Sequence, residues 1–354
     1  MLKTETIPSS DGKSSRTLYL FLPDTPPRAI LQICHGMCEY LLRYQPFAEY
    51  LCAKGVLVCG IDNAGHGQGA ASTAKEEKQG KKAGDPLLGH IPGGKNLSLP
   101  VEDQYLVYEH LRKIYRHLPY LLFGHSMGSF LARKFITRYP DAMDGVILCG
   151  TSAGNQPLFW GILLARLLSL VFGKKHPSPL LMKLSFGHYN DKFPGEEGSA
   201  WLSRNRENVQ RYDGDPLCGF TFTASTMGQM FGLLREINSE QWYNELPLSL
   251  PLLLVSGEED PVGGYGNDIR EIYEKLQDRE LCNVAMKLYP GDRHEILNEE
   301  DRETVYADIL AFLEEVIEGV NAARTEHYSL RFGGNSPAEP EETENTEEKG
   351  GQAL

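Results

Sequence analysis

The sequence lacks an excess of positive charge, because its 35 Lys and Arg residues are outnumbered by 48 Asp and Glu, giving a net charge of −13. Nucleic-acid backbones are bound by a surplus of Lys and Arg, so a nucleic acid is excluded as the main ligand. Long apolar runs are also missing. Residues 1–15 hold no apolar core of the kind that a secretory signal needs. The longest apolar stretch, residues 158–172, is too short to cross a bilayer. These absences predict a cytoplasmic enzyme.

A disulfide framework is also missing. The seven cysteines are odd in number, scattered, and mostly embedded in apolar runs, which predicts free thiols in a reducing compartment. Cys34 and Cys38 flank a loop, but no second Cys or His pair with zinc-like spacing accompanies them. We therefore expect neither a metal nor another cofactor.

What the sequence does contain is an alternation of short apolar runs and helical patterns. The runs predict strands at residues 17–22, 29–34, 56–62, 120–123, 145–149, 251–256 and 284–289. The periodic segments predict helices at residues 43–54, 99–117, 127–139, 269–276 and 302–320. This alternation indicates an α/β fold, with a mostly parallel central sheet and helices on both faces.

The alternation stops between residues 151 and 247, where helical segments follow one another without a clear strand. We expect an inserted helical cap there, over the sheet edge at which open α/β folds bind ligands. The core would then comprise residues 1–150 and 248–332. Residues 333–354, rich in Glu, Pro, Gly, Asn and Thr, are predicted to be a disordered acidic tail.

Within this predicted cap, residues 158–172 are apolar nearly all round. The favoured interpretation is a helix buried between cap and core. The other interpretation is a helix that lines an acyl tunnel and exposes part of its surface to micelles or membrane, and the two interpretations can both hold.

The strongest chemical signal is the sequence Gly-His-Ser-Met-Gly at residues 124–128, a G-x-S-x-G motif between an apolar strand and a helix. In that context the serine sits on a strained strand-to-helix turn, and glycines two positions away leave room for it. The motif predicts Ser126 as a nucleophile.

A serine hydroxyl needs a base, and the base needs an orienting acid, in the chain order Ser, Asp or Glu, His. Asp260 follows the strand at 251–256, and His294 lies in a Gly-containing loop after the next strand. These two residues are predicted to complete a catalytic triad. The other carboxylates near these loops that compete for the acid role are Glu258, Glu259 and Asp292.

An oxyanion hole needs two backbone N–H donors. One should be that of Met127, directly after the nucleophile. The other should be that of Met37, after the strand at 29–34, because its neighbour Gly36 allows close approach of the backbone.

Several of these segments resemble those of the monoacylglycerol lipase and lysophospholipase branch of the α/β-hydrolases, within the S33-type serine aminopeptidase domain. Residues 35–44 (HGMCEYLLRY) resemble its HGxxEhxxRY signature, 62–67 (DNAGHG) its DxxGHGxS, and 124–128 its GHSMG. Residues 257–262 and 292–295 match its acid and base regions, and 212–217 (YDGDPL) a segment of its cap. Gly69 departs from the usual Ser, and Met37 is bulkier than the usual small residue. The resemblance implies a carboxylic ester of a single acyl chain, monoacylglycerol or lysophospholipid, as substrate. Transient membrane or micelle contact through the cap is the functional interpretation of the apolar segment at residues 158–172.

Other charged and histidine residues in these motifs are interpreted as structural and not as catalytic. Glu39 and Arg43 are spaced i, i+4, which favours a local ion pair. Asp62 and His66 are interpreted as structural. His125 precedes the nucleophile and is interpreted as packing the turn.

Two further functions stay open, because a fold does not determine its chemistry. A proline-releasing aminopeptidase or a short-chain carboxylesterase could use the same scaffold. An aminopeptidase would need acidic cap residues for the substrate amine, for which Glu196, Glu197 and Glu207 are available. A non-catalytic ligand-binding or interaction protein acting through the acidic tail is the third hypothesis, and the complete triad argues against it.

Overall fold

The computed structural model describes residues 1–67, 88–154, 157–281 and 283–332. These residues form an eight-stranded sheet in the order β1-β2-β4-β3-β5-β6-β7-β8. The strands are β1 (Leu2–Pro8), β2 (Ser15–Phe21), β3 (Ala29–Cys34), β4 (Val56–Ile61), β5 (Tyr120–His125), β6 (Gly145–Cys149), β7 (Leu252–Gly257) and β8 (Val284–Tyr289). From β4 to β8 the neighbours are parallel, whereas β1 and β2 are antiparallel. The predicted mostly parallel sheet is confirmed.

The central strands are buried along their whole length, as their continuous apolar runs predict for a sheet covered on both faces. Their register brings the carboxyl ends together at one edge. Gly124 of β5 lies opposite Cys34 of β3, and His125 lies opposite Cys149 of β6. The loops that leave this edge carry the predicted site residues.

Helices cover both faces of the sheet. On one face the core includes side chains from α3 (Ser98–Ile114), α4 (Met127–Arg138) and α10 (Asn267–Asp278). On the other it includes side chains from α1 (Gln45–Cys52) and α11 (Arg302–Phe332). A 3₁₀ turn, η1 (Leu41–Tyr44), precedes α1, and another, η4 (Ile296–Asn298), precedes α11.

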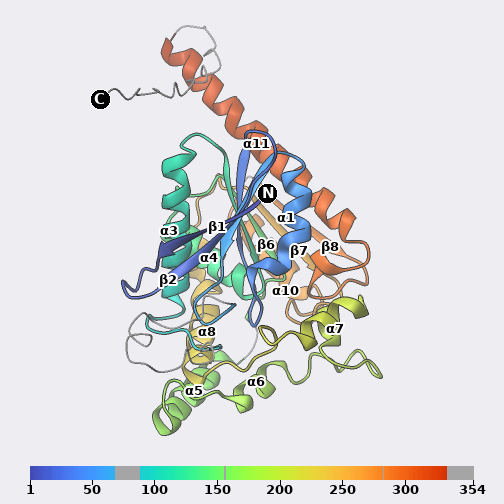
Figure 1. Ribbon diagram of the computed structural model, residues 1–354. Helices are drawn as coiled ribbons and strands as arrows, with labels where there is room; N and C mark the ends of the chain where they lie inside the picture. Colours follow the sequence, from blue (N-terminus) through green and yellow to red (C-terminus); the bar gives the residue numbers. More distant parts are fainter. Residues whose placement is uncertain (68–87, 155–156, 282, 333–354) are drawn as a thin grey trace, which may run out of the picture.

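The described segment between β6 and β7 contains helices joined by loops. It comprises α5 (Leu158–Phe172), α6 (Pro179–Phe186), η3 (Ala200–Leu202), α7 (Arg206–Gly214), α8 (Ala224–Ile237) and α9 (Glu240–Glu245). Helices α5, α6 and α7 gather at one end of the sheet, whereas α11 runs beside the sheet and extends past its other end (Figure 1). The division of the chain into core and cap at the predicted residues stays a prediction, and the predicted tail lies outside the described residues.

Three expectations need correction. Strand β1 was not expected, because six of its seven residues are exposed and it has no apolar alternation. Helix α11 continues to Phe332 rather than ending at residue 320, although residues 321–326 are exposed and show no apolar stripe. Helix α5 buries only Ile162 and Ala165 of its fifteen residues, so its interpretation as a buried helix is wrong.

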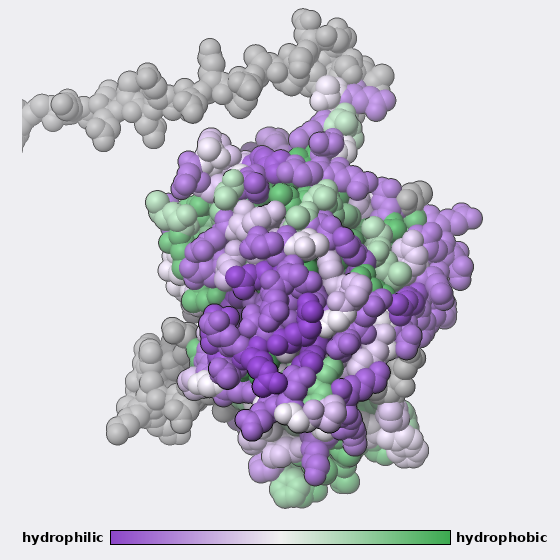
Figure 2. Space-filling model, turned by 90° about the vertical axis from the view of Figure 1, so that its right-hand side faces the viewer, coloured by the Kyte–Doolittle hydropathy of each residue, from purple (hydrophilic) through white to green (hydrophobic). Residues whose placement is uncertain are grey.

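The exposed apolar side chains gather on α5 and α6. The large ones on these two helices are Phe159, Trp160, Leu163, Leu167, Leu170, Val171, Phe172, Leu180 and Leu184. Hydrophilic residues dominate most of the view in Figure 2. Hydrophobic residues appear in several places, among them the lower end of the molecule, where Figure 1 places α5 and α6.

Candidate active site

Ser126 occupies the tight turn between β5 and α4. Its backbone has φ 53° and ψ −121°, a conformation that L-residues rarely adopt and that is retained at sites where the surroundings enforce it. The Ser126 N–H donates to the carbonyl of Cys149 at 2.9 Å. A Cβ at Gly128 would overlap the carbonyl oxygen of Cys34, and one at Gly124 would lie 2.5 Å from the carbonyl oxygen of Gly128. Both glycines of the motif are therefore required by close backbone contacts.

His294 and Asp260 form a buried pair. The imidazole Nδ1 of His294 lies 2.9 Å from Oδ2 of Asp260, and both side chains are almost inaccessible to solvent. The Asp260 carboxylate is itself held, because it accepts a hydrogen bond from the Ser256 hydroxyl at 3.1 Å and one from the Val262 N–H at 2.8 Å. This arrangement orients the imidazole, as a base in a triad requires.

The competing carboxylates have other positions. Asp292 accepts a hydrogen bond from the Arg204 guanidinium, Glu258 lies 3.4 Å from Arg270, and Glu259 is exposed. Of these four carboxylates, Asp260 is the one that contacts the His294 imidazole.

The loop after β3 approaches the nucleophile. The Gly36 N–H donates to Oε1 of Glu39 at 2.6 Å, and a Cβ at Gly36 would lie 3.2 Å from the Cβ of Ser126. Met37 follows Gly36, and it lines the same pocket as Ser126 and Met127. The two predicted oxyanion donors therefore belong to residues that line the same pocket as Ser126.

This pocket has a volume of about 210 Å³ and is lined by both Ser126 and His294. Much of its remaining wall is apolar and comes from the helical segment. The apolar side chains that α6 and α8 contribute are Met182, Phe186, Met227, Met230, Phe231 and Leu234. A site of this composition suits a hydrocarbon chain better than a charged group.

The helical segment also holds the loop that carries His294. The ring of Trp201, in η3, lies 5.1 Å from that of His294, and the Glu295 N–H donates to the Leu202 carbonyl at 2.7 Å. Sequence reasoning missed this support, because no motif connects η3 with a loop almost a hundred residues later.

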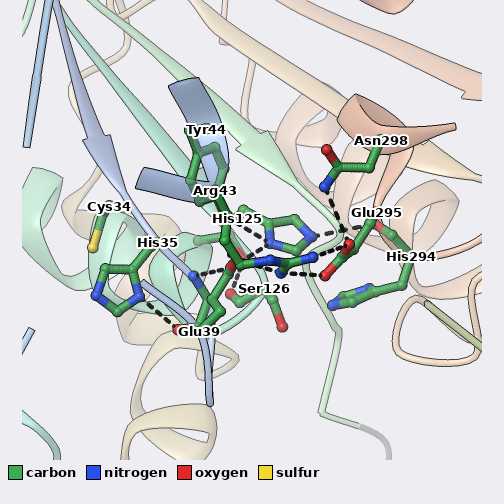
Figure 3. Close-up of polar contacts among 12 residues, drawn as sticks. Cys34, His35, Glu39, Arg43, Tyr44, His125, Ser126, His294, Glu295 and Asn298 are labelled. Carbon is green, nitrogen blue, oxygen red and sulfur yellow. Dashed lines mark hydrogen bonds and ion pairs between the residues drawn. The ribbon is translucent and has the colours of Figure 1, made fainter. Parts of the chain in front are cut away.

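Charged side chains beside the pocket form a buried cluster (Figure 3). The predicted ion pair of Glu39 and Arg43 is confirmed, with an N–O distance of 2.8 Å. Arg43 also binds Glu295 through two hydrogen bonds of 2.6 and 2.7 Å. Burial opposes ionisation of Glu39, but hydrogen bonding from His125 and the positive charge of Arg43 outweigh it and lower the pKa of this carboxylate. Sequence reasoning missed Glu295, and its place directly after His294 was the available signal.

The remaining singled-out residues lie outside the reacting centre. Asp62 accepts hydrogen bonds from the Tyr19 hydroxyl and the Leu41 N–H. His66 is fully buried, and burial together with nearby His35 lowers its pKa to about 3. Glu196 pairs with Arg293 at 2.8 Å.

Neither Glu196 nor the other two carboxylates suggested for an amine, Glu197 and Glu207, are among the described residues that line the pocket. Within the described ranges no group of His, Cys, Asp and Glu side chains is arranged to hold a metal ion. The cysteines of the same ranges, including Cys34 and Cys38, are free.

The geometry agrees with comparisons to known proteins. A family model described as serine aminopeptidase, S33, matches residues 25–301. The chain belongs to this family. The predicted likeness to monoacylglycerol lipases of the α/β-hydrolase fold is confirmed, and the family and the fold make the chain a serine hydrolase.

Two relatives of this S33-family chain are named lipases. A monoacylglycerol lipase of Mycolicibacterium smegmatis is 27% identical over 84% of this chain and 92% of its own length. The human monoglyceride lipase is 27% identical over 78% of this chain and 80% of its own length. A carboxyl esterase of Bacillus coagulans, solved in complex with glycerol, superposes with a TM-score of 0.80 at 26% identity. That match covers 89% of this chain and 99% of the esterase.

Across the described part of this S33-family chain, no helix is both long and apolar enough to traverse a membrane.

Proposed function

We propose that this serine hydrolase cleaves carboxylic esters of a single acyl chain, monoacylglycerol or lysophospholipid, through an acyl-enzyme. One observation carries the proposal: Ser126, on its strained turn, and His294, whose ring is held by Asp260, line the same largely apolar pocket. The names of the relatives support an acylglycerol, and the apolar wall from α6 and α8 supports a hydrocarbon chain.

In the proposed mechanism, Ser126 attacks the ester carbonyl while His294 accepts its proton. Asp260 holds the imidazole in the correct orientation and stabilises its positive charge. The N–H groups of Met37 and Met127 bind the negative charge that develops on the carbonyl oxygen. The proton then moves from His294 to the leaving alcohol. A water molecule activated by His294 releases the fatty acid and restores Ser126.

The apolar surface of α5 and α6 is proposed to meet the membrane or micelle that holds the substrate. Its side chains include Trp160 and Leu170, exposed to 66% and 84%. An exposed apolar patch next to an acyl pocket would lower the cost of moving a lipid from its aggregate into the site. The proposed contact involves only the surface of the protein, because α5 packs one side against α8 and only its opposite side would touch the lipid.

Replacement of the nucleophile tests the proposal. Ser126→Ala should lower the turnover of p-nitrophenyl esters by about 10⁶-fold, because the base and oxyanion donors alone cannot form the acyl-enzyme. The same variant should no longer be labelled by a fluorophosphonate. Ser15→Ala, on the exposed end of β2, is the matched control and should retain both properties.

Two outcomes would contradict the proposal. If the fluorophosphonate does not label the wild-type protein, Ser126 is not an activated nucleophile. If the protein cleaves a prolyl anilide faster than any monoacylglycerol or lysophospholipid, its function is that of an aminopeptidase and not of a lipid esterase.

A further inference from the structure

The ring of His125, directly before the nucleophile, is buried and has oxygen atoms opposite both nitrogens (Figure 3). Its Nε2 lies 3.2 Å from the carbonyl oxygen of His294. Its Nδ1 lies 3.2 Å from Oε1 of Glu39 and 3.0 Å from the hydroxyl oxygen of Tyr44. A carbonyl oxygen carries no proton, so the bond to His294 requires a proton on Nε2.

The other side of the ring requires a proton as well. The Tyr44 hydroxyl donates its one proton to Oε1 of Glu39, at the shorter distance of 2.7 Å. Tyr44 therefore presents a lone pair to His125, and Glu39 presents a carboxylate oxygen that also accepts the Gly36 N–H. If Nδ1 carried no proton, its lone pair would face the lone pairs of the Tyr44 hydroxyl and of Glu39 Oε1. Such a contact is costly in a buried site, where polar atoms need hydrogen-bond partners.

The charges of the cluster lead to the same protonation state. Arg43 binds both Glu39 and Glu295, and the side chains of all three are at most 10% exposed. One guanidinium does not balance two carboxylates, and buried charges are stable only when paired. An imidazolium at His125 brings the charge of these four groups to zero.

We propose that His125 is doubly protonated in the working enzyme and acts as a positioning residue for the reacting groups. Its Nε2–H holds the backbone of His294, and its Nδ1–H holds Glu39. Because Glu39 in turn binds the N–H of Gly36, next to Met37, the imidazolium connects the nucleophile turn, the base loop and the oxyanion loop. The kinetic consequence rests on the proposed function, whereas the protonation state does not.

The surroundings of His125 determine how its charge depends on pH. The titratable and charged groups that face it from the packed elements are Glu39, Arg43, Tyr44, Cys149, His294 and Glu295. Burial lowers the pKa of His125, but the hydrogen bond and charge of Glu39, with the charge of Glu295 and the His294 carbonyl, raise it above its ordinary value of 6.5. The charged form is therefore retained to a higher pH than in a free imidazole and is lost as the pH rises further, so activity should decline on the alkaline side.

The protonation state can be measured without turnover, by ¹⁵N NMR of histidine-labelled full-length protein at pH 7. Both ring nitrogens of His125 should give protonated shifts, and the same result should be obtained in Ser126→Ala. The signals are assigned by their loss in His125→Gln. If that variant does not fold, a neutron crystal structure of the wild type locates the ring deuterons. A ring nitrogen without a proton overturns the proposal.

The pH profile of kcat/KM tests the positioning role. His125→Gln keeps a donor for the His294 carbonyl but cannot titrate, so it should lower kcat/KM about tenfold, mainly through kcat, and abolish the alkaline decline. Glu39→Gln removes the carboxylate that stabilises the cation, so it should move the decline to lower pH. His110→Gln, which changes a half-buried histidine paired with Glu5 outside the pocket, is the control and should leave the profile unchanged. An alkaline decline that persists unchanged in His125→Gln would contradict the positioning role.

Discussion

Strand β7 and helix α5 are both largely apolar in sequence, but β7 is buried along its whole length, whereas α5 exposes most of its large apolar side chains. The strand lies inside a sheet that helices cover on both faces, so each of its side chains meets a neighbour. The helix packs one side against α8, where Ala165 is close to Gly228, and its other side meets solvent. Apolar sequence therefore serves stability in one region and, we propose, lipid contact in the other.

The largest expected contrast concerns stability. Leu254→Ala, in β7, should lower the free energy of unfolding by about 2–5 kcal/mol, because Leu254 is fully buried and its loss leaves a cavity. Leu170→Ala, in α5, should change it by less than about 0.5 kcal/mol, since that side chain is already 84% exposed. Urea unfolding curves measure both. Similar losses in the two variants would mean that α5 is covered in solution.

The second contrast concerns lipid surfaces. Replacing Trp160, Leu167 and Leu170 together by Gln keeps good helix formers but removes apolar area. Binding to phosphatidylcholine vesicles, measured by co-sedimentation, should weaken about tenfold, while hydrolysis of soluble p-nitrophenyl acetate stays within about twofold. Leu248→Gln, an exposed leucine outside α5, is the control and should bind vesicles like the wild type. If the triple variant binds the vesicles as tightly as the wild type, α5 does not contact the lipid surface.

The last contrast concerns the contact between the helical segment and the sheet, where the Arg204 guanidinium donates a hydrogen bond to Asp292 after β8. Burial and the nearby charges of Glu299 and Asp301 raise the pKa of Asp292 from 3.8 to about 7, although Arg204 opposes them. In the folded state the carboxyl thus stays protonated while its unfolded form ionises. Stability from this group is fully present below pH 3.8 and is lost as the pH rises toward 7.

Asp292→Asn should abolish this loss, because an amide resembles the protonated carboxyl. The melting temperature of the variant relative to the wild type should therefore increase steadily between pH 4 and pH 7. Thermal unfolding at several pH values measures it. A relative melting temperature that falls over this range would show that the pair with Arg204 dominates.

Much of the fold was predictable because its signals are local. Each buried parallel strand is a continuous apolar run, and the glycines around Ser126 mark a turn that other residues cannot form. Strand β1 was not predictable, since an exposed edge strand is held by backbone pairing with β2 and carries no apolar pattern.

In the candidate site, too, some features were predictable from the sequence and others were not. Ser126, Asp260 and His294 could be proposed from strand ends and chain order alone, because chemistry restricts the residue types at those positions. Their contacts depended on elements far apart in the chain. Trp201 packs on His294 from η3, and Arg43 reaches Glu295 across the sheet edge.

By itself, the sequence determined which residue types could react, and where the chain had to turn to present them. Only the tertiary structure decided which carboxylate meets His294, which side of α5 faces water, and which atoms surround the ring of His125. The physical reason is that apolar periodicity and turn chemistry act between neighbours in the chain. Burial, charge balance and protonation instead depend on whichever groups the fold brings together.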